Sequence, residues 1–186
     1  LVIGGRGKMG HWMADFLAAQ GFAVTVDDTS GEVEGLDIVA DWRTSELHHD
    51  IIVVATPIRI ANEVLAELAG RRPRGIVFDI GSLKTPLRSG LDPLRAAGCH
   101  VTSVHPMFGP DTELLSGRHV IFIDLGDAAA LAEARALFGS TMADLVVMDR
   151  DYLAIPADQI KDIKTMMTMV GGRIVYDATS PEASTR

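Results

Sequence analysis

Cysteine is nearly absent from the sequence: Cys99 is the single one among 186 residues. A lone cysteine cannot form a disulfide within the chain, which excludes the disulfide framework of small secreted proteins. The sequence also lacks an apolar run of roughly 18 residues, the length that spans a bilayer, and a basic segment followed by a signal-type hydrophobic stretch. We therefore expect a cytoplasmic protein with no membrane partner.

Basic side chains are in short supply as well, with 17 Lys and Arg against 25 Asp and Glu and a formal net charge of -8. Because a nucleic-acid ligand needs a concentrated basic face, we expect no nucleic-acid partner. The six histidines show no metal-ligand spacing, so the sequence indicates no metal site. Apolar residues make up 47% of the chain, as in compact soluble proteins.

Two alternating patterns fill most of the chain. Short apolar runs rich in β-branched residues predict strands at 1–3, 23–26, 51–55, 75–79, 100–104, 119–123 and 144–148. Apolar residues at helical spacing predict helices at 9–19, 58–68, 86–97 and 128–138. This alternation favours βαβ units around a mostly parallel sheet, which is a Rossmann-type, doubly wound α/β fold.

The alternation stops after Asp149. Residues 166–176 then have the pattern of a β-hairpin around a Gly-Gly pair, and the last ten residues have the composition of a disordered end. We predict a Rossmann domain at 1–149 followed by a short, foreign-looking tail at 150–186. Because the first three residues already read as part of a strand, we expect the natural start of the chain to lie upstream.

A G-x-G-x-x-G motif follows the first predicted strand and opens the first predicted helix, with its glycines at Gly5, Gly7 and Gly10. In dinucleotide-binding folds the first glycine permits a tight turn, the second lets the backbone approach the pyrophosphate, and the third lets the helix pack on the sheet. The helix start at Lys8 and Met9 supplies backbone amides to the anion. The alternative is that the glycines only shape a strand-to-helix turn.

An acidic residue at the end of the second strand can accept hydrogen bonds from the adenine ribose of a dinucleotide. Asp27 and Asp28 both qualify by position. Asp28 is our choice for this contact, with Asp27 facing solvent. Residues 29–34 contain no Lys or Arg that could hold a 2′-phosphate. The sequence therefore favours NAD over NADP.

A second group of polar residues follows the later strands, where ligands bind in open α/β sheets. Thr56 and Pro57 follow the strand at 51–55, and His105 begins a His-Pro-Met-Phe-Gly-Pro run. An imidazole is suited to accept a hydroxyl proton as hydride leaves the same carbon. The alternative for His105 is a polar residue that satisfies backbone groups in a Pro- and Gly-rich loop.

Ser82 and Lys84 lie after the strand at 75–79, in the run Asp-Ile-Gly-Ser-Leu-Lys. Ser82 could donate a hydrogen bond to substrate or cofactor, or it could cap the helix that follows. Lys84 could bind a substrate carboxylate, or it could be a solvated lysine in the first turn of that helix. All the strand ends named here are expected to converge near a nicotinamide.

Together, the glycine motif, the Asp-Ile-Gly-Ser-Leu-Lys run and the His-Pro-Met-Phe-Gly-Pro-Asp run resemble prephenate dehydrogenases over residues 1–149. The resemblance implies oxidative decarboxylation of prephenate to 4-hydroxyphenylpyruvate, or of arogenate, with hydride transfer to NAD or NADP on the route to tyrosine. It also implies that His105 engages the ring hydroxyl as hydride leaves and that Ser82 assists there. A metal is unnecessary for this chemistry.

The resemblance has a limit, because members of that family continue into a helical domain that forms the dimer and supplies substrate-binding arginines. Residues 146–178 instead resemble the C-terminal segment of amidohydrolases, and we interpret the chain as chimeric or truncated, with a join at 146–149. The tail gives no reason to predict hydrolase activity. Two other hypotheses are an NAD-binding module without catalysis and a different β-hydroxyacid-type dehydrogenase.

Overall fold

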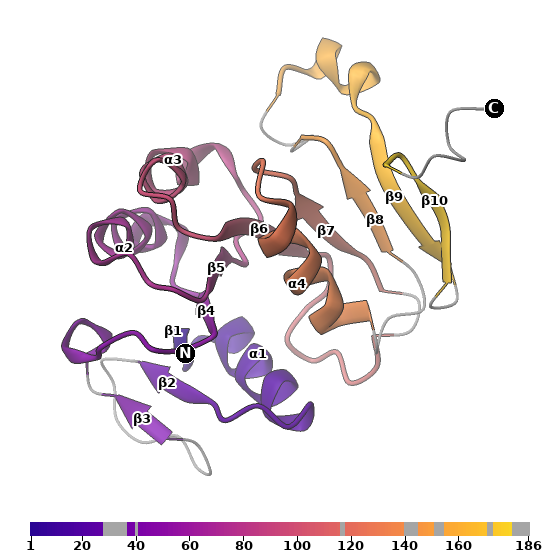
Figure 1. Cartoon of the computed structure of the whole chain (residues 1–186). Helices are drawn as coiled ribbons and strands as arrows, with labels where there is room; N and C mark the ends of the chain where they lie inside the picture. Colours follow the sequence, from indigo (N-terminus) through magenta and orange to yellow (C-terminus); the bar gives the residue numbers. More distant parts are fainter. Residues whose placement is uncertain are drawn as a thin grey trace.

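The computed structural model describes residues 1–27, 37–39, 41–115, 118–139, 145–150, 155–170 and 173–179. Within these residues one ten-stranded sheet runs through the molecule in the order β10-β9-β8-β7-β6-β5-β4-β1-β2-β3 (Figure 1). The strands are β1 (Val2–Ile3), β2 (Thr25–Asp27), β3 (Asp37–Val39), β4 (Ile51–Val54), β5 (Ile76–Asp79), β6 (Val101–Pro106), β7 (Val120–Ile123), β8 (Leu145–Met148), β9 (Thr165–Val170) and β10 (Arg173–Asp177).

Strands β3, β2, β1, β4, β5 and β6 are all parallel, and their order 3-2-1-4-5-6 is that of a Rossmann fold. Helices α1 (Lys8–Ala19) and α4 (Ala128–Gly139) cover one face, and α2 (Ile58–Arg71) and α3 (Arg88–Ala96) cover the other (Figure 1). The predicted fold class is confirmed.

The two faces of the sheet have separate apolar cores, and β4 shows how the sequence supplies both. Ile52 and Val54 belong to the core beneath α2 and α3, whereas Val53 between them belongs to the core beneath α1 and α4. Each of the three is at most 1% exposed. A strand covered on both faces needs an uninterrupted apolar run, which explains why the strand predictions succeeded here.

Beyond β6 the sheet changes direction. Strand β7 is antiparallel to β6, β8 returns parallel to β7 through α4, and β9 and β10 form an antiparallel hairpin on β8. Met167 of β9 is 1% exposed and shares a core with Val147 of β8. The hairpin predicted at 166–176 is therefore confirmed, and its Gly-Gly pair lies outside the described residues.

Several elements differ from the sequence-based expectations. Strand β3 was not expected, and neither were the 3₁₀ turns Trp42–Thr44, Thr85–Leu87 and Ala157–Asp162. Asp177, counted with a disordered end, is the last residue of β10, and residues 180–186 lie outside the described part of the chain. Where the structure describes the chain, none of its helices has the length and apolar character needed to cross a membrane.

Candidate functional site

Four adjacent parallel strands bring the predicted site residues to one edge of the sheet. The residues that pair in one row near their carboxyl ends are Ile3, Val54, Asp79 and Ser103. Two residues after these four positions in the sequence are Gly5, Thr56, Gly81 and His105. Because neighbouring strands lie about 4.8 Å apart, the first and last of these positions are separated by roughly 14 Å, the scale of a small-molecule site.

The glycine turn after β1 leaves no room for a side chain at Gly4, Gly5 or Gly10. Gly4 has φ +83° and donates its backbone N–H to the carbonyl of Asp27 at 2.8 Å. A Cβ on Gly10 would lie 2.2 Å from the carbonyl oxygen of Gly4, and one on Gly5 would lie 2.3 Å from Cγ1 of Val26. The motif is therefore required for α1 to pack against β1 and β2.

Helix α1 begins at Lys8, directly beyond Gly7, and no side chain caps its amino terminus. The first amides of an α-helix have no partner within the helix, so they are available to an anion together with the positive end of the helix dipole. Lys8 is exposed and Met9 is half-buried. The turn thus has the geometry of a phosphate-binding site.

Thr56, at the end of β4, packs directly against this turn. Its backbone nitrogen lies 2.9 Å from the position that a Cβ on Gly4 would take. Its Oγ1 is buried and finds no hydrogen-bond partner among the residues that the structure describes. Pro57 is exposed and precedes α2, whose amino terminus also has no side-chain cap. A buried hydroxyl without a partner beside an anion-binding turn indicates a place for a ligand.

The expectation that Asp27 faces solvent is wrong. Asp27 ends β2 with only 8% of its surface exposed, and its Oδ1 accepts the backbone N–H of Trp42 at 2.7 Å. A buried carboxylate needs such donors, and the 3₁₀ turn at Trp42 supplies one. Asp28, our choice for the ribose contact, lies outside the described residues.

Ser82 is exposed on the turn that follows β5. The alternative role of helix cap is wrong for this residue, because the next helical turn begins at Thr85, with Lys84 before it and no side-chain cap. The hydroxyl is thus not engaged in capping and lies at the same edge as Thr56 and His105.

The interpretation of Lys84 as a solvated lysine is also wrong. Its side chain is buried, and its Nζ donates to Oδ1 of Asp79 at 2.6 Å and to the carbonyl of Val104 at 2.8 Å. Asp79 is 0% exposed, and its other carboxylate oxygen accepts the hydroxyl of Ser103. Sequence reasoning missed this network, although an Asp at a strand end and a Lys five residues later were a signal for it.

His105 is half-buried near the end of β6, opposite Ile121 of β7, and it has contacts of its own. The loop after it is tied to α1 by Trp12. The rings of Trp12 and Phe108 meet edge to face at 4.8 Å, and Nε1 of Trp12 donates to the carbonyl of Thr112 at 2.8 Å. The helix that begins at the glycine turn therefore also holds the loop that follows His105 and the end of β6.

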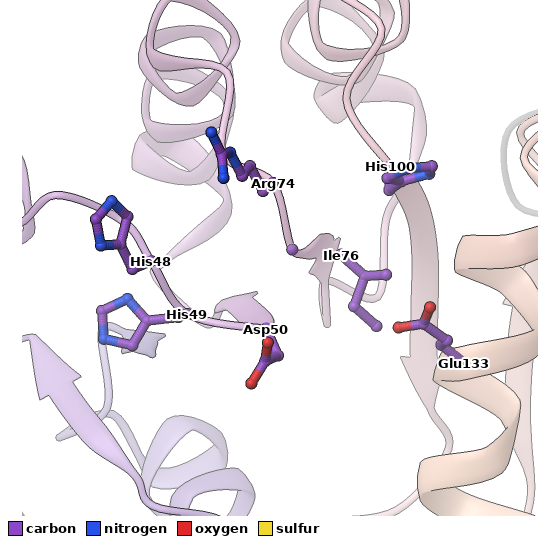
Figure 2. Close-up of a pocket in the computed structure, with 8 residues that line it drawn as sticks. His48, His49, Asp50, Arg74, Ile76, His100 and Glu133 are labelled. Atoms are coloured by element: carbon purple, nitrogen blue, oxygen red, sulfur yellow. The ribbon is translucent and has the colours of Figure 1, made fainter.

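A different polar pocket lies at the opposite, amino-terminal edge of the strands. Figure 2 shows its lining side chains, which are His48, His49, Asp50, Arg74, Ile76, His100 and Glu133, around an open volume of 370 Å³. Desolvation lowers the pKa of His49, which favours its neutral form. Within the described parts of the chain, no three His, Cys, Asp or Glu side chains are grouped to hold a metal ion.

Comparisons with known proteins agree on the family. Residues 14–147 match the model of the prephenate dehydrogenase nucleotide-binding domain. A probable arogenate/prephenate dehydrogenase of Methanocaldococcus jannaschii is 30% identical over 128 residues, which is 64% of this chain and 29% of that protein. The T-protein of Enterobacter agglomerans is also 30% identical over 128 residues, 67% of this chain and 31% of that protein.

Among solved structures, prephenate dehydrogenase from A. aeolicus, in complex with hydroxyphenyl propionate and NAD+, superposes with a TM-score of 0.58 at 19% identity. The match covers 75% of this chain and 55% of that one. At this identity the likeness shows the fold. The chain spans about a third of the length of the curated relatives it matches.

Proposed function

Since this chain belongs to the prephenate dehydrogenase family through its nucleotide-binding domain, we propose that it binds NAD and uses it in an oxidative decarboxylation of prephenate or arogenate. The observation that carries the proposal is the alignment of the glycine turn, Thr56 and His105 at the carboxyl edge of one parallel sheet. Ligands of open α/β sheets bind at this edge.

The cofactor would lie across the amino terminus of α1. The backbone amides of Lys8, Met9 and Gly10 would hold the pyrophosphate, with Gly5 and Gly7 leaving room for it. The hydroxyl of Thr56 and the ring of Pro57 would contact the cofactor beyond the pyrophosphate. Asp28 would accept the ribose hydroxyls, which favours NAD over NADP because a carboxylate repels a 2′-phosphate.

Bound NAD would supply the acceptor for hydride from the ring carbon that carries the substrate hydroxyl. His105 would accept the hydroxyl proton as that hydride leaves, and Ser82 would donate a hydrogen bond to the same oxygen. Loss of CO2 would make the ring aromatic and leave a phenolate oxygen, to which His105 would return the proton, so the chain's residues need to move only this one proton. The product from prephenate would be 4-hydroxyphenylpyruvate, a precursor of tyrosine.

A second candidate is a nucleotide-binding module without turnover, because the family match at residues 14–147 is to the nucleotide-binding domain. The match covers 29% to 31% of the curated relatives. We propose a Rossmann domain at 1–149 followed by a short tail at 150–186, whose strands β9 and β10 extend the same sheet. The proposed location is the cytoplasm.

Calorimetric titration with NAD, followed by prephenate in the same sample while NADH absorbance is recorded, separates the candidates. Saturable NAD binding with NADH formation supports the dehydrogenase. Saturable binding without NADH leaves the module. A chain that binds no NAD would overturn both.

A further inference from the structure

We infer that Lys84 is a positioning residue whose buried ammonium joins the turn that carries Ser82 to the strand that carries His105. The inference rests on the proposed function. Lys84 Nζ donates on one side to Asp79, the last residue of β5, at 2.6 Å. On the other side it donates to the carbonyl of Val104, the residue before His105, at 2.8 Å.

The ion pair closes the turn after β5 into a short loop. Asp79 and Lys84 flank the four residues 80–83, and Oδ1 of Asp79 also accepts the backbone N–H of Gly81 at 2.9 Å. Ser82 follows Gly81 and lies in a segment that is tied at both ends. The position of its hydroxyl is therefore set by the carboxylate and the ammonium rather than by a helix cap.

The same network reaches β6 twice. Ser103 donates its hydroxyl to the second oxygen of Asp79, and the carbonyl of Val104 accepts from Lys84. Side chains alternate along a strand, so Ser103 and His105 lie on the same face of β6. The network thus holds the segment of β6 just before His105 at two points, the side chain of Ser103 and the carbonyl of Val104.

Burial makes this arrangement rigid. The side chains of Lys84 and Asp79 are 5% and 1% exposed, whereas those of the surface pair Arg43 and Glu67 are 49% and 45% exposed. A charge that cannot reach water must keep its partners, so neither Lys84 nor Asp79 can leave without moving the other. A buried pair of this kind fixes geometry, which a surface pair does not.

The inference predicts a separation between binding and turnover. The four hydrogen bonds described above join β5, the turn after it and β6, and none of these four reaches the glycine turn or Thr56. Loss of the network should therefore lower kcat and leave the affinity for NAD nearly unchanged.

The test uses the double variant Asp79→Asn with Lys84→Met, which removes both buried charges and so leaves no unpaired ion to unfold the chain. We expect a thermal midpoint close to that of the unaltered chain, an NAD dissociation constant within twofold, and a kcat at least tenfold lower. Lys84→Arg, which keeps a cation with several donors, should recover part of the lost kcat. The control His100→Gln removes a contact with Asp127 next to the other end of β6 and should change neither the NAD dissociation constant nor kcat.

NMR provides a readout that does not depend on turnover. In the double variant the imidazole resonances of His105 and the amide resonance of Ser82 should both shift, and in His100→Gln they should stay in place. Unchanged resonances, an unchanged kcat, or a kcat and NAD affinity that fall together would each overturn the positioning role. If the unaltered chain forms no NADH, the proposed function fails, and the resonances alone decide the role of Lys84.

Discussion

The two ends of the same parallel strands differ in their titratable residues and in the helix ends that they carry. Judged by titratable residues alone, the wrong end would be chosen as the cofactor site. The amino-terminal edge carries His48, His49 and His100 around an open polar pocket. The carboxyl edge carries His105, yet α1 and α2 both begin there without side-chain caps. A parallel βαβ arrangement collects helix amino termini at one edge, so the polarity of the chain, more than the number of titratable groups, decides where an anionic cofactor binds.

The largest expected effect comes from exchanging a histidine at each edge. His105→Asn should lower kcat about 100-fold or more, because a positioned proton acceptor contributes 10²- to 10⁴-fold. Steady-state NADH formation measures it. His100→Gln, at the amino edge, serves as the matched control, and equal losses from both substitutions would remove the distinction between the edges.

The glycines offer a second comparison. Gly10→Ala places a Cβ against the carbonyl of Gly4, so the turn must open, and we expect a loss of about 2 kcal/mol in unfolding free energy together with much weaker NAD binding by calorimetry. Gly70→Ala is the control near the end of α2, where a Cβ meets nothing within 4 Å. It should stabilise the chain by up to about 1 kcal/mol. Normal NAD affinity in Gly10→Ala would contradict the phosphate-binding role.

A third substitution tests the preference for NAD over NADP. Asp28→Ala should weaken NAD binding roughly tenfold, the size expected for hydrogen bonds to a charged group. NADP binding should weaken less, because only the ribose diol loses its acceptor. Parallel titrations with the two cofactors measure the difference, and equal losses would count against Asp28.

The smallest effect concerns Asp127, which belongs to the amino edge. Burial opposes ionisation, but hydrogen bonds from the Ala130 N–H, His100 and the Val101 N–H lower the pKa of this carboxyl below its ordinary value. A lowered pKa stabilises the fold above the unfolded pKa, and the contribution is lost as the pH falls through the folded value. Asp127→Asn should therefore cost about 0.5 kcal/mol at neutral pH.

Thermal melts of both chains across the pH range check this prediction for Asp127. The difference between the two chains should shrink toward zero as the pH falls well below 4, where the unaltered Asp127 is also uncharged. NAD affinity should not change at any pH, since Asp127 and His100 lie at the amino edge, away from the glycine turn. A gap in stability that widens in acid would show that the sign is wrong.

Sequence reasoning located most of the fold because strands buried on both faces are continuous apolar runs. It missed β3, which has three residues and, in the described part of the chain, pairs with β2 alone. The reversal at β7 was readable in principle: residues 107–119 contain no helical pattern, and a parallel return requires a long crossover. The hydrogen bonds at the carboxyl ends of the strands, by contrast, cannot be predicted from hydrophobic periodicity, so sequence reasoning did not find them.

The sequence predicted at which edge of the sheet the candidate site lies, but it did not predict the side-chain contacts within the site. Gly5, Thr56 and His105 follow predicted strands, so their convergence follows from parallel topology. The burial of Asp27 and Lys84 could not be predicted, because charged residues usually lie at the surface. Their partners, Trp42 and Asp79, lie 15 and 5 residues away, and only the fold brings the first pair together.

The placement of the two tryptophans has an optical consequence. Trp42 donates its backbone N–H to Asp27 at the proposed ribose end of the cofactor, and Trp12 packs against Phe108 beside the loop after His105. The chain has no other tryptophan, so all of its indole emission arises from these two environments. A reduced nicotinamide bound between them would absorb that emission by energy transfer, and the unlabelled protein would report cofactor occupancy through its own fluorescence.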